Sequence, residues 1–275
     1  MKFFFIAGEP SGDHLGAALM NGFDKLLSAP AVFVGVGGTQ MIETGFTSLF
    51  PMKEISIMGM KEIFLNYFFL KKRIAQTANA VIEANPDALI TIDLPEFNLR
   101  VADIVRKKSN IPIIHYVAPT VWAWRAKRAV KMTKYVDHVL ALLPFEPKYM
   151  TKVGLSCDFV GHPVVEEPLA SIEDALAFRT QYDLGDAPVM LCLPGSRVSE
   201  ISRLAPIFGE TLSILKLSVP ELRFIVPAAP AIAAEVSNLV SEWQEEVIFL
   251  DPRCQTPAEA LLQKKAAFRA ANVAL

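Results

Sequence analysis

Residues 3–19 read FFFIAGEPSGDHLGAAL, an apolar run followed by a glycine-rich turn and then by a helical pattern. A short apolar strand that leads through such a turn into a helix is the opening unit of parallel α/β folds. The three glycines are spaced four residues apart, unlike the G-x-G-x-x-G of dinucleotide-binding turns. Glu9 and Asp13 would also repel a diphosphate. The stretch therefore predicts an α/β domain whose first turn does not cradle a dinucleotide.

The rest of the sequence continues this alternation of strands and helices. Apolar strand patterns occur at 3–7, 32–36, 88–92, 112–117, 138–142, 189–193, 222–226 and 247–250. Helical patterns occur at 13–27, 71–84, 199–216, 231–243 and 257–270, and the final ANVAL opens a further buried strand. Short strands separated by longer helices indicate doubly wound parallel sheets with crossover helices. The fold class expected is therefore α/β.

A change of composition divides the protein. Prolines and acidic residues gather near 161–172, as in a linker. We therefore expect two Rossmann-like domains, 1–165 and 166–275. The second is short for a doubly wound domain, since domains usually hold about 100–150 residues. We expect it to be incomplete, and the sequence to be truncated at its C-terminus.

Composition and charge limit the functions to consider. The protein has 275 residues, of which 52% are hydrophobic, and a formal net charge of −2. Near-neutral charge argues against a nucleic-acid-binding protein. Three single cysteines without C-x-x-C spacing fit buried thiols in a reducing compartment better than disulfides or zinc. The apolar run at 3–7 is too short for a secretory signal, so we expect a cytoplasmic protein. The spacing of the cysteines also predicts no bound metal.

The first turn permits two interpretations. Ser11 or Asp13 could cap the helix that comes next. Alternatively, Glu9, Ser11 and Asp13 could hydrogen-bond the neutral hydroxyls of a sugar at the end of the first strand. The spacing does not choose between them.

A second polar cluster comes after the strand at 88–92, within PDALITIDLPEFNLRVA (86–102). Asp93 comes directly after the strand, and Glu96 and Asn98 lie in the same loop. Ligands of open α/β sheets bind at the carboxyl ends of the strands, where a carboxylate can act as a general base toward a hydroxyl. The alternative is a carboxylate that caps the next helix.

The stretch IIHYVAPTVWAWRAKRAVKMTKYVDHVLALLPFE (113–146) combines aromatic and basic residues. His115 ends a strand, and the loop behind it contains Trp122, Trp124 and Arg125. The next residues, Lys127, Arg128 and Lys131, follow on a helix. Aromatic and basic residues together are typical of single-stranded nucleic-acid sites, which the overall charge disfavours. Core packing of the tryptophans and a structural role for His115 stay open.

A third turn, in VMLCLPGSRVSEISRLAPIF (189–208), predicts an anion site. Gly195, Ser196 and Arg197 lie between a strand and the start of a helix. Free amides at a helix N-terminus and an adjacent guanidinium suit a nucleotide diphosphate. The alternative is a capping serine beside a solvated arginine.

The stretch 57–74 has an amphipathic pattern. One helical face is expected to carry Ile57, Met60, Phe64 and Phe68, followed by the basic run Lys71, Lys72 and Arg73. Charged residues interrupt the stretch, so it cannot span a bilayer as an apolar helix. Apolar residues followed by cations suit an interface with lipid, and a core helix against the sheet is the alternative.

Taken together, these segments closely resemble the lipid-A-disaccharide synthase family. The resemblance runs from about residue 4 to about residue 203 and is carried by AGEPSGDHLGA, GVGG, IMGMKEIF, TIDLPEFN, HYVAPTVWAWRAKR, LALLPFE, VGHP and LPGSRVSEI. Near the end, KKAAFRAANVAL resembles the segment just before the family's Ala-Ser-Gly-Thr motif. The sequence lacks that motif and the family's remaining C-terminal part, including much of the expected uridine-binding wall.

The resemblance implies a GT-B glycosyltransferase, with an N-terminal domain that holds the acceptor and a C-terminal domain that holds the UDP-sugar. The implied reaction joins UDP-2,3-diacylglucosamine to 2,3-diacylglucosamine 1-phosphate (lipid X), giving the β-1,6 disaccharide phosphate and UDP. It belongs to lipid A biosynthesis in Gram-negative bacteria, at the cytoplasmic face of the inner membrane. No cofactor, metal or nucleic acid is implied, and a homo-oligomer is left open.

The resemblance also assigns residues. It matches Asp93 to the family's base for the acceptor 6-hydroxyl and Arg197 to the group that neutralises charge on the leaving UDP. The expected substrate-binding residues are Glu9, Ser11, Gly12, Asp13, Asn98, His115, Trp124, Arg125, Gly195 and Ser196. The alternatives are another GT-B nucleotide-sugar enzyme, such as UDP-GlcNAc 2-epimerase, and a non-catalytic fragment that binds acyl-sugar lipid or membrane.

Overall fold

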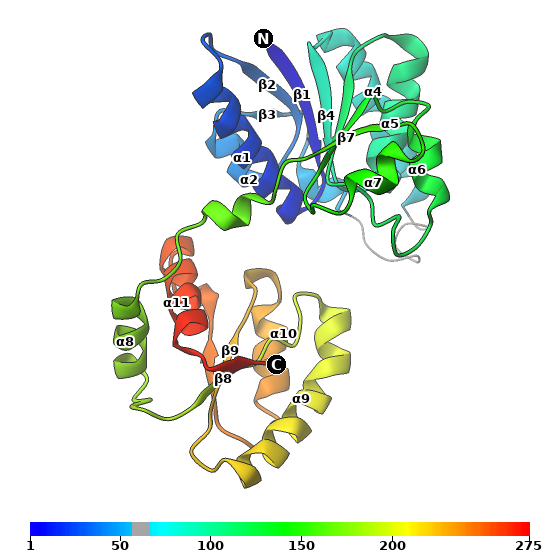
Figure 1. Ribbon diagram of the computed structural model, residues 1–275. Coiled ribbons are helices and arrows are strands. Elements are labelled where there is room, and N and C mark those ends of the chain that lie inside the picture. Colours follow the sequence, from blue (N-terminus) through cyan, green and yellow to red (C-terminus); the bar gives the residue numbers. More distant parts are fainter. Residues whose placement is uncertain (57–65) are drawn as a thin grey trace. The chain divides into compact units, whose positions relative to one another are not determined.

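A computed structural model describes residues 1–56 and 66–275 of the protein, which form two compact units (Figure 1). Unit 1 is Met1–Glu166 and unit 2 is Glu167–Leu275. Each unit contains one β-sheet whose strands all run parallel. Parallel strands joined by helices confirm the α/β fold class expected from the sequence.

The sheet of unit 1 has seven described strands. They are β1 (Lys2–Ala7), β2 (Val32–Val36), β3 (Thr47–Ser48), β4 (Ala88–Ile92), β5 (Ile113–Tyr116), β6 (His138–Ala141) and β7 (Ser156–Phe159). The described helices are α1 (Pro10–Leu26), α2 (Thr39–Glu43), α4 (Tyr67–Ala84), α5 (Pro95–Lys108), α6 (Lys127–Met132) and α7 (Pro147–Thr151), with 3-10 turns η1 (Met52–Glu54) and η2 (Pro163–Glu166).

The strand order of unit 1 is β3-β2-β1-β4-β5-β6-β7. From β1 the backbone builds the sheet toward β3, and then returns to the other side of β1 to add β4 and the strands after it. The direction of winding therefore reverses between β1 and β4. Open α/β sheets bind ligands at such a switch point, outside the carboxyl ends of the strands.

The two faces of this sheet carry separate cores. Alternate residues of a strand point to opposite faces, so Phe4 and Ile6 pack on one side of β1 and Phe3 and Phe5 on the other. The side of Phe4 is covered by α4, α5 and α6, and that of Phe5 by α1 and α2 (Figure 1). Burial on both faces explains why 3–7 of β1 is continuously apolar and why β4 is apolar except for the buried Thr91.

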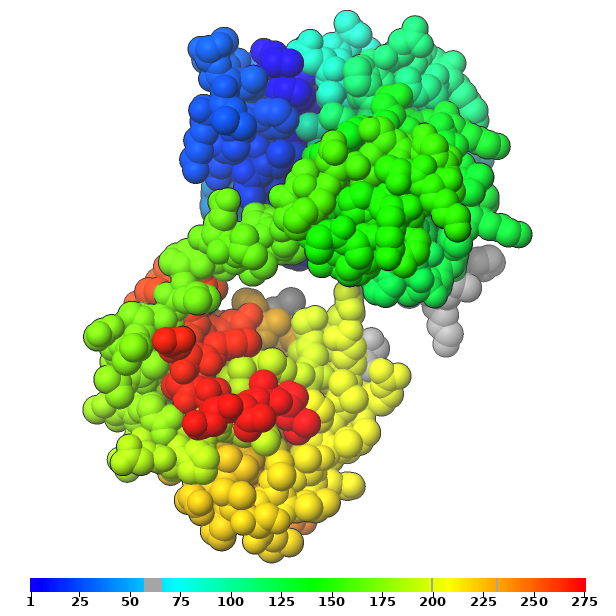
Figure 2. Space-filling view, in the orientation of Figure 1, coloured from blue at the N-terminus to red at the C-terminus, as the bar shows by residue number. Residues whose placement is uncertain are grey.

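Unit 2 has a smaller parallel sheet. Its described strands are β8 (Val189–Leu191), β9 (Arg223–Pro227), β10 (Val247–Leu250) and β11 (Val273–Ala274), in the order β10-β9-β8-β11. Its described helices are α8 (Ile172–Gln181), α9 (Val198–Ser218), α10 (Ala233–Val240) and α11 (Pro257–Ala270), with 3-10 turns η3 (Pro230–Ile232) and η4 (Pro252–Cys254). The winding reverses between β8 and β11. Figure 2 shows β11, in red, at the surface of this unit.

Most predicted elements are confirmed, and the exceptions have local causes. Helix α1 begins at Pro10 rather than 13, because proline is well suited to the first turn of a helix. Strands β3 and β7 were not predicted, because they are short edge strands with exposed residues. Cys157 and Cys192 are buried as expected, but Cys254 is exposed. Within the described ranges, no helix combines the length and apolarity that a bilayer crossing needs.

Candidate active site

The β1–α1 loop lies at the switch point of unit 1, and Asp13 organises it. The Asp13 side chain is 3% exposed. Its carboxylate accepts hydrogen bonds from the amides of Gly38 at 2.8 Å, Gln40 at 2.9 Å and Met41 at 3.2 Å. These amides are the free donors at the start of α2, so Asp13 on α1 caps α2. A Cβ at Gly38 would lie 2.6 Å from Oδ2 of Asp13, which explains the glycine.

The structure thus gives Asp13 a capping role, but on a different helix from the one considered in the sequence. Helix α1 itself has Glu9 at its N-cap and no side-chain cap, so capping of α1 by Ser11 or Asp13 is wrong. Ser11 is exposed in the first turn of α1, and Gly12 is buried there. Contacts of Glu9, Ser11, Gly12 and Asp13 with a sugar stay predictions.

The β4–α5 turn, on the other side of the switch point, has an unusual backbone. Asp93 has φ of 47° and Leu94 has φ of 42°. Left-handed backbone is uncommon outside glycine and is concentrated at functional sites. Val117 (φ 78°) and Arg125 (φ 53°), which come after the adjacent strand β5, also have left-handed backbone. Four of the six such non-glycine residues in the described part of the protein therefore lie after β4 or β5.

Asn98 holds the β4–α5 turn in place. It lies on α5 and is fully buried. Its Nδ2 donates to the backbone oxygens of Asp93 at 2.7 Å and Ile92 at 3.0 Å, and lies 3.5 Å from that of Ile6 in β1. One amide thus ties together the ends of β4 and β1, so Asn98 positions Asp93.

The environment of Asp93 suits a base. Burial raises the pKa of its carboxyl group, and the hydrogen bond from the Leu94 amide partly offsets this. A raised pKa means that the carboxylate, once ionised, binds a proton more strongly than an ordinary aspartate does. The backbone amide of Asp93 donates to the backbone oxygen of Tyr116 at 2.9 Å, which fixes the turn against β5.

His115 lies on β5, opposite Thr91 of β4, and is fully buried. Its Nδ1 is 2.8 Å from the Thr91 hydroxyl oxygen. Burial and the nearby positive charge of Arg128 lower the pKa of His115 to about 4, so the ring is neutral at pH 7. This geometry favours the structural alternative for His115 over a direct contact with substrate.

Glu96 of α5 forms ion pairs with the segment that comes after β5. The Glu96 carboxylate pairs with Arg125 at 3.2 Å and also with Arg128 on α6. The Arg125 guanidinium lies over the ring of Trp124, 4.5 Å from its centroid, and the indole NH of Trp124 donates to the Thr120 hydroxyl at 2.8 Å. Trp124 and Arg125 are exposed, so the core-packing alternative is wrong for Trp124.

The β8–α9 turn of unit 2 also lies at a switch point, and it carries the predicted anion site. Gly195 has φ of +130°, and a Cβ there would lie 2.8 Å from the Cβ of Glu200. The Ser196 amide donates to Oε2 of Glu200 at 3.1 Å, and Arg197 pairs with Oε1 of Glu200 at 2.8 Å. The hydrogen bonds from Ser196 and Arg197 lower the pKa of Glu200, which is therefore ionised at neutral pH.

Sequence reasoning missed Glu200. Its carboxylate accepts hydrogen bonds from the Ser196 amide and the Arg197 guanidinium, the two donors expected to bind an external anion. Glu200 is three residues after the N-cap Arg197, the position of the acidic residue in a capping box, and this spacing could have revealed it. Serine capping of α9 is wrong, because the N-cap is Arg197 and makes no side-chain cap. A ligand that uses both Ser196 and Arg197 must displace Glu200.

The amphipathic stretch is described only in part. Ile57, Met60 and Phe64 lie outside the described residues. Phe68, in the first turn of α4, is 83% exposed. Farther along, Ile74 and other α4 residues pack on the sheet, so the core-helix alternative holds for that part of α4.

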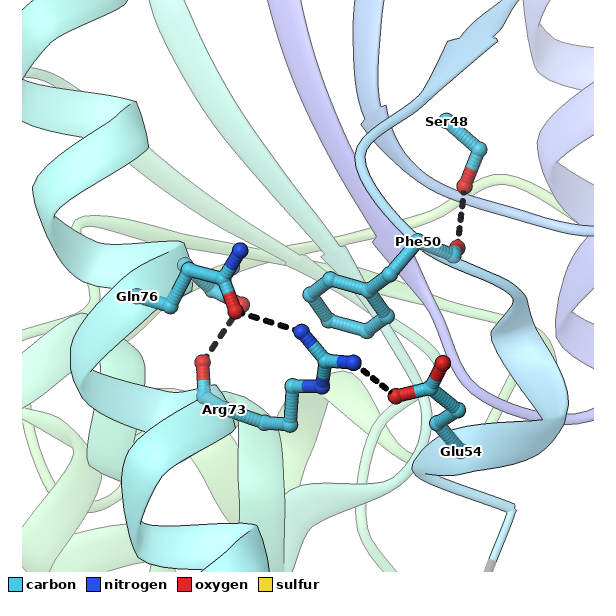
Figure 3. Close-up of polar contacts among 6 residues, drawn as sticks. Ser48, Phe50, Glu54, Arg73 and Gln76 are labelled. Carbon is cyan, nitrogen blue, oxygen red and sulfur yellow. Dashed lines mark hydrogen bonds and ion pairs between the residues drawn. The ribbon is translucent and has the colours of Figure 1, made fainter.

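Arg73 differs from its exposed neighbours Lys71 and Lys72. Its guanidinium pairs with Glu54 of η1, donates to the Gln76 side chain at 2.6 Å and lies 4.4 Å from the centroid of the Phe50 ring (Figure 3). Arg73 therefore connects α4 to the segment after β3 and is not free to meet headgroups.

The described residues form no group of three or more His, Cys, Asp or Glu side chains arranged to hold a metal ion. Unit 1 has a carboxylate of raised pKa, Asp93, and unit 2 has a guanidinium beside a helix N-terminus, Arg197. The first can accept a proton from a hydroxyl, and the second can neutralise an anion.

Comparisons with known proteins agree on one family. The profile described as "Lipid-A-disaccharide synthetase" matches residues 3–271. The protein is 54% identical to lipid-A-disaccharide synthase of Ruegeria pomeroyi over its full length and 68% of that relative's length. It is 48% identical to that of Rhodospirillum centenum, covering 90% of this protein and 62% of the relative. The sequence thus spans about two thirds of the relatives' length.

Solved structures share the fold. UDP-GlcNAc 2-epimerase from Neisseria meningitidis, solved with UDP-GlcNAc bound, matches with a TM-score of 0.61 and 13% identity, covering 100% of this protein and 77% of that one. A glycosyltransferase from Rickettsia africae matches with a TM-score of 0.53 and 13% identity, covering 94% and 69%. At this identity the likeness shows the GT-B fold alone.

Proposed function

The chain belongs to the lipid-A-disaccharide synthase family, a family of hexosyltransferases, and from this membership we propose the reaction that it serves. The reaction transfers 2,3-diacylglucosamine from UDP to the 6-hydroxyl of 2,3-diacylglucosamine 1-phosphate (lipid X), forming the β-1,6 disaccharide phosphate and releasing UDP. Relatives 54% and 48% identical carry the synthase name, which favours this reaction over that of a 2-epimerase.

Asp93 is the base in this proposal. Its position after β4, at the switch point, supports the assignment, as does the burial that raises its pKa. As the acceptor oxygen attacks the sugar carbon, its proton passes to the carboxylate of Asp93. Asn98 keeps the turn in the strained conformation that Asp93 requires. This arrangement is the single observation that carries the proposal.

Arg197 stabilises the leaving group. As the bond to the sugar breaks, negative charge grows on the diphosphate of UDP. A guanidinium and the amides at the start of α9 can supply the charge neutralisation that a metal ion supplies in other transferases. The proposal therefore includes no metal and no cofactor. The exposure of Arg197 and its position at the N-cap of α9 support this role.

The proposed acceptor and donor are lipids, so we place the protein on the cytoplasmic face of the inner membrane as a peripheral protein. The exposed Phe68 at the start of α4 supports an interfacial contact. Phe68→Ser should weaken binding to liposomes, measured by co-sedimentation. Leu26→Ser is the control, because Leu26 is 86% exposed on α1. Equal binding by both variants would remove this part of the proposal.

The main test measures UDP release by the purified 275-residue protein, given both acylated glucosamine substrates in detergent micelles. Release that is lost in Asp93→Ala is the expected result. A folded protein that binds the acyl-sugar lipid without releasing UDP would favour the non-catalytic alternative. If release then returned on appending the C-terminal part of a relative, the reaction would stand for the family and fail for these 275 residues by themselves.

A further inference from the structure

A cleft of about 1210 Å³ lies between helices α4, α5 and α6 of unit 1. Its floor includes Ile74 and Leu99, whose side chains are 8% and 7% exposed. Its walls are basic. Among the lining residues that the structure describes, seven are Lys or Arg and two, Glu96 and Asp103, are acidic. The cleft therefore has an excess of positive charge above an apolar floor.

The two acidic residues are already paired with cations. Glu96 pairs with Arg125 and Arg128, and Asp103 pairs at 2.6 Å with Lys107, which is not among the lining residues. The five remaining cations make no side-chain hydrogen bond or ion pair within the described ranges: Lys71, Arg100, Lys127, Lys131 and Lys134. Cations gathered in one cleft repel each other and favour a multiply charged anion as ligand.

The fold directs these side chains into the cleft. Helix α6 buries Ala129 and Met132 against the core, which leaves Lys127 and Lys131, four residues apart, on its exposed side. Tyr135 also lines the cleft. Its pKa is raised by burial and by the negative charges of Asp103 and Glu96, so its hydroxyl stays protonated and able to donate.

The lining of the cleft includes residues that are close to Asp93 in the sequence. Pro95 and Glu96 belong to its lining and come just after Asp93 in the β4–α5 turn. Arg125 belongs to it as well and lies in the loop after β5. One part of the lining is therefore the first turn of α5, two residues after Asp93.

We propose that this cleft binds the phosphate monoester of the glycolipid acceptor. A phosphate carries up to two negative charges and several acceptor oxygens, which suits a group of unpaired guanidinium and ammonium groups. The apolar floor suits the hydrocarbon of the same molecule. This inference rests on the proposed function, because it takes the acceptor to be a sugar 1-phosphate. The cleft then fixes the end of the acceptor away from the 6-hydroxyl and orients that hydroxyl toward Asp93.

The test measures binding rather than turnover. The 275-residue protein is titrated with detergent micelles that contain either 2,3-diacylglucosamine 1-phosphate or the same lipid without phosphate. We expect the double variant Arg100→Ala/Lys131→Ala to bind the phosphorylated lipid at least about tenfold more weakly, because it loses charged hydrogen bonds. Binding of the lipid without phosphate should not change.

The control variant Lys25→Ala/Lys152→Ala removes the same charge from α1 and the end of α7, outside the cleft. An equal loss in this control, or no loss in the cleft variant, would overturn the proposal. Vesicles of phosphatidylglycerol and phosphatidylcholine separate the acceptor from bulk lipid as the source of phosphate. A cleft variant that loses only phosphatidylglycerol binding would assign the cleft to the bilayer instead and overturn the proposal.

Failure of the cleft and failure of the function are distinguishable. The cleft proposal stands and the proposed reaction fails if the cleft variant loses binding of the phosphorylated lipid while the protein releases no UDP, either alone or with a relative's C-terminal part appended. If UDP is released and the cleft variant keeps the same KM for the acceptor, the reaction stands and the cleft proposal fails.

Discussion

The β4–α5 turn and the β8–α9 turn lie after central strands at the switch points of their own sheets, yet they are built differently. In the first, Asp93 and Leu94 adopt left-handed backbone without glycine, and the buried Asn98 holds the turn. In the second, Gly195 takes the unusual backbone, and the exposed Arg197 pairs with Glu200. The first turn resists movement, whereas the second has a cation whose present partner an incoming anion can replace.

This difference matches the two tasks that we propose. A base must meet one hydroxyl at a fixed position, so a turn held by buried hydrogen bonds serves it well. A site for a diphosphate must bind and then release a charged group, and exposed ion pairs exchange at little cost. Each of the experiments below tests one side of this contrast.

Among the variants that follow, the largest effect is expected from Arg197→Ala. Removing the guanidinium leaves charge on the departing UDP without its partner, and turnover should fall by about 100- to 1000-fold. Single-turnover kinetics of UDP release would measure this, in the protein extended with a relative's C-terminal part if the 275 residues alone are inactive. Arg203→Ala, an exposed arginine on the same helix, is the matched control. Normal turnover in Arg197→Ala would show that this turn does not act on the leaving group.

Asn98→Ala tests whether the first turn depends on its buried amide. The variant leaves the backbone oxygens of Asp93 and Ile92 without the donor, so the free energy of unfolding should fall by about 2 kcal/mol. Urea denaturation followed by circular dichroism would measure the loss. Asn110→Ala, at an exposed position after α5, should change little. Equal stability of the two variants would mean that the turn holds its shape without Asn98.

The pH dependence tests the burial of Asp93. Burial raises the pKa of Asp93 in the folded protein. The free energy of unfolding therefore falls as pH rises from the ordinary aspartate pKa to the raised value, and it stays lower above that value. Above that pH, Asp93→Asn should be more stable than the unmodified protein, and the difference should disappear as pH falls toward the ordinary aspartate pKa. Turnover should decline over the same range, because the neutral acid cannot accept a proton.

Melting curves at several pH values would measure this difference. His115, with its pKa lowered to about 4, also titrates in acid, but it is present in both proteins and its effect cancels in the comparison. A stability difference that does not vary with pH would show that Asp93 titrates alike in the folded and unfolded protein.

The smallest effect is expected from Glu200→Gln. Glutamine can still accept a hydrogen bond from the Ser196 amide. Because it is uncharged, it competes less strongly than glutamate with UDP for the Arg197 guanidinium. The affinity for UDP should rise by a few fold at most, because exposed ion pairs contribute about 0–1 kcal/mol. Isothermal titration with UDP would measure it, with Glu210→Gln as an exposed control on α9. Weaker binding in Glu200→Gln would show that Glu200 supports the ligand instead of competing with it.

Much of the fold could be predicted from the sequence because the strands are buried on both faces. β4 and β10 lie at the predicted residues, and α11 begins and ends as predicted. Short edge strands escaped prediction, since β3 consists of two polar residues, Thr47 and Ser48, and so has no apolar pattern. The candidate site was found where polar residues interrupt such a pattern, as at Asp93 after β4.

The sequence by itself determined the parallel α/β class, the family, and the turns at which the polar residues gather, because apolar periodicity and residue order are local properties. Only the tertiary structure decided what those residues contact. Asp13 caps α2 instead of its own helix, His115 is buried and neutral, and Glu200 accepts from the predicted anion site. The basic cleft likewise joins α4, α5 and α6. Such partners depend on how strands are ordered in the sheet, and spacing along the sequence does not contain that information.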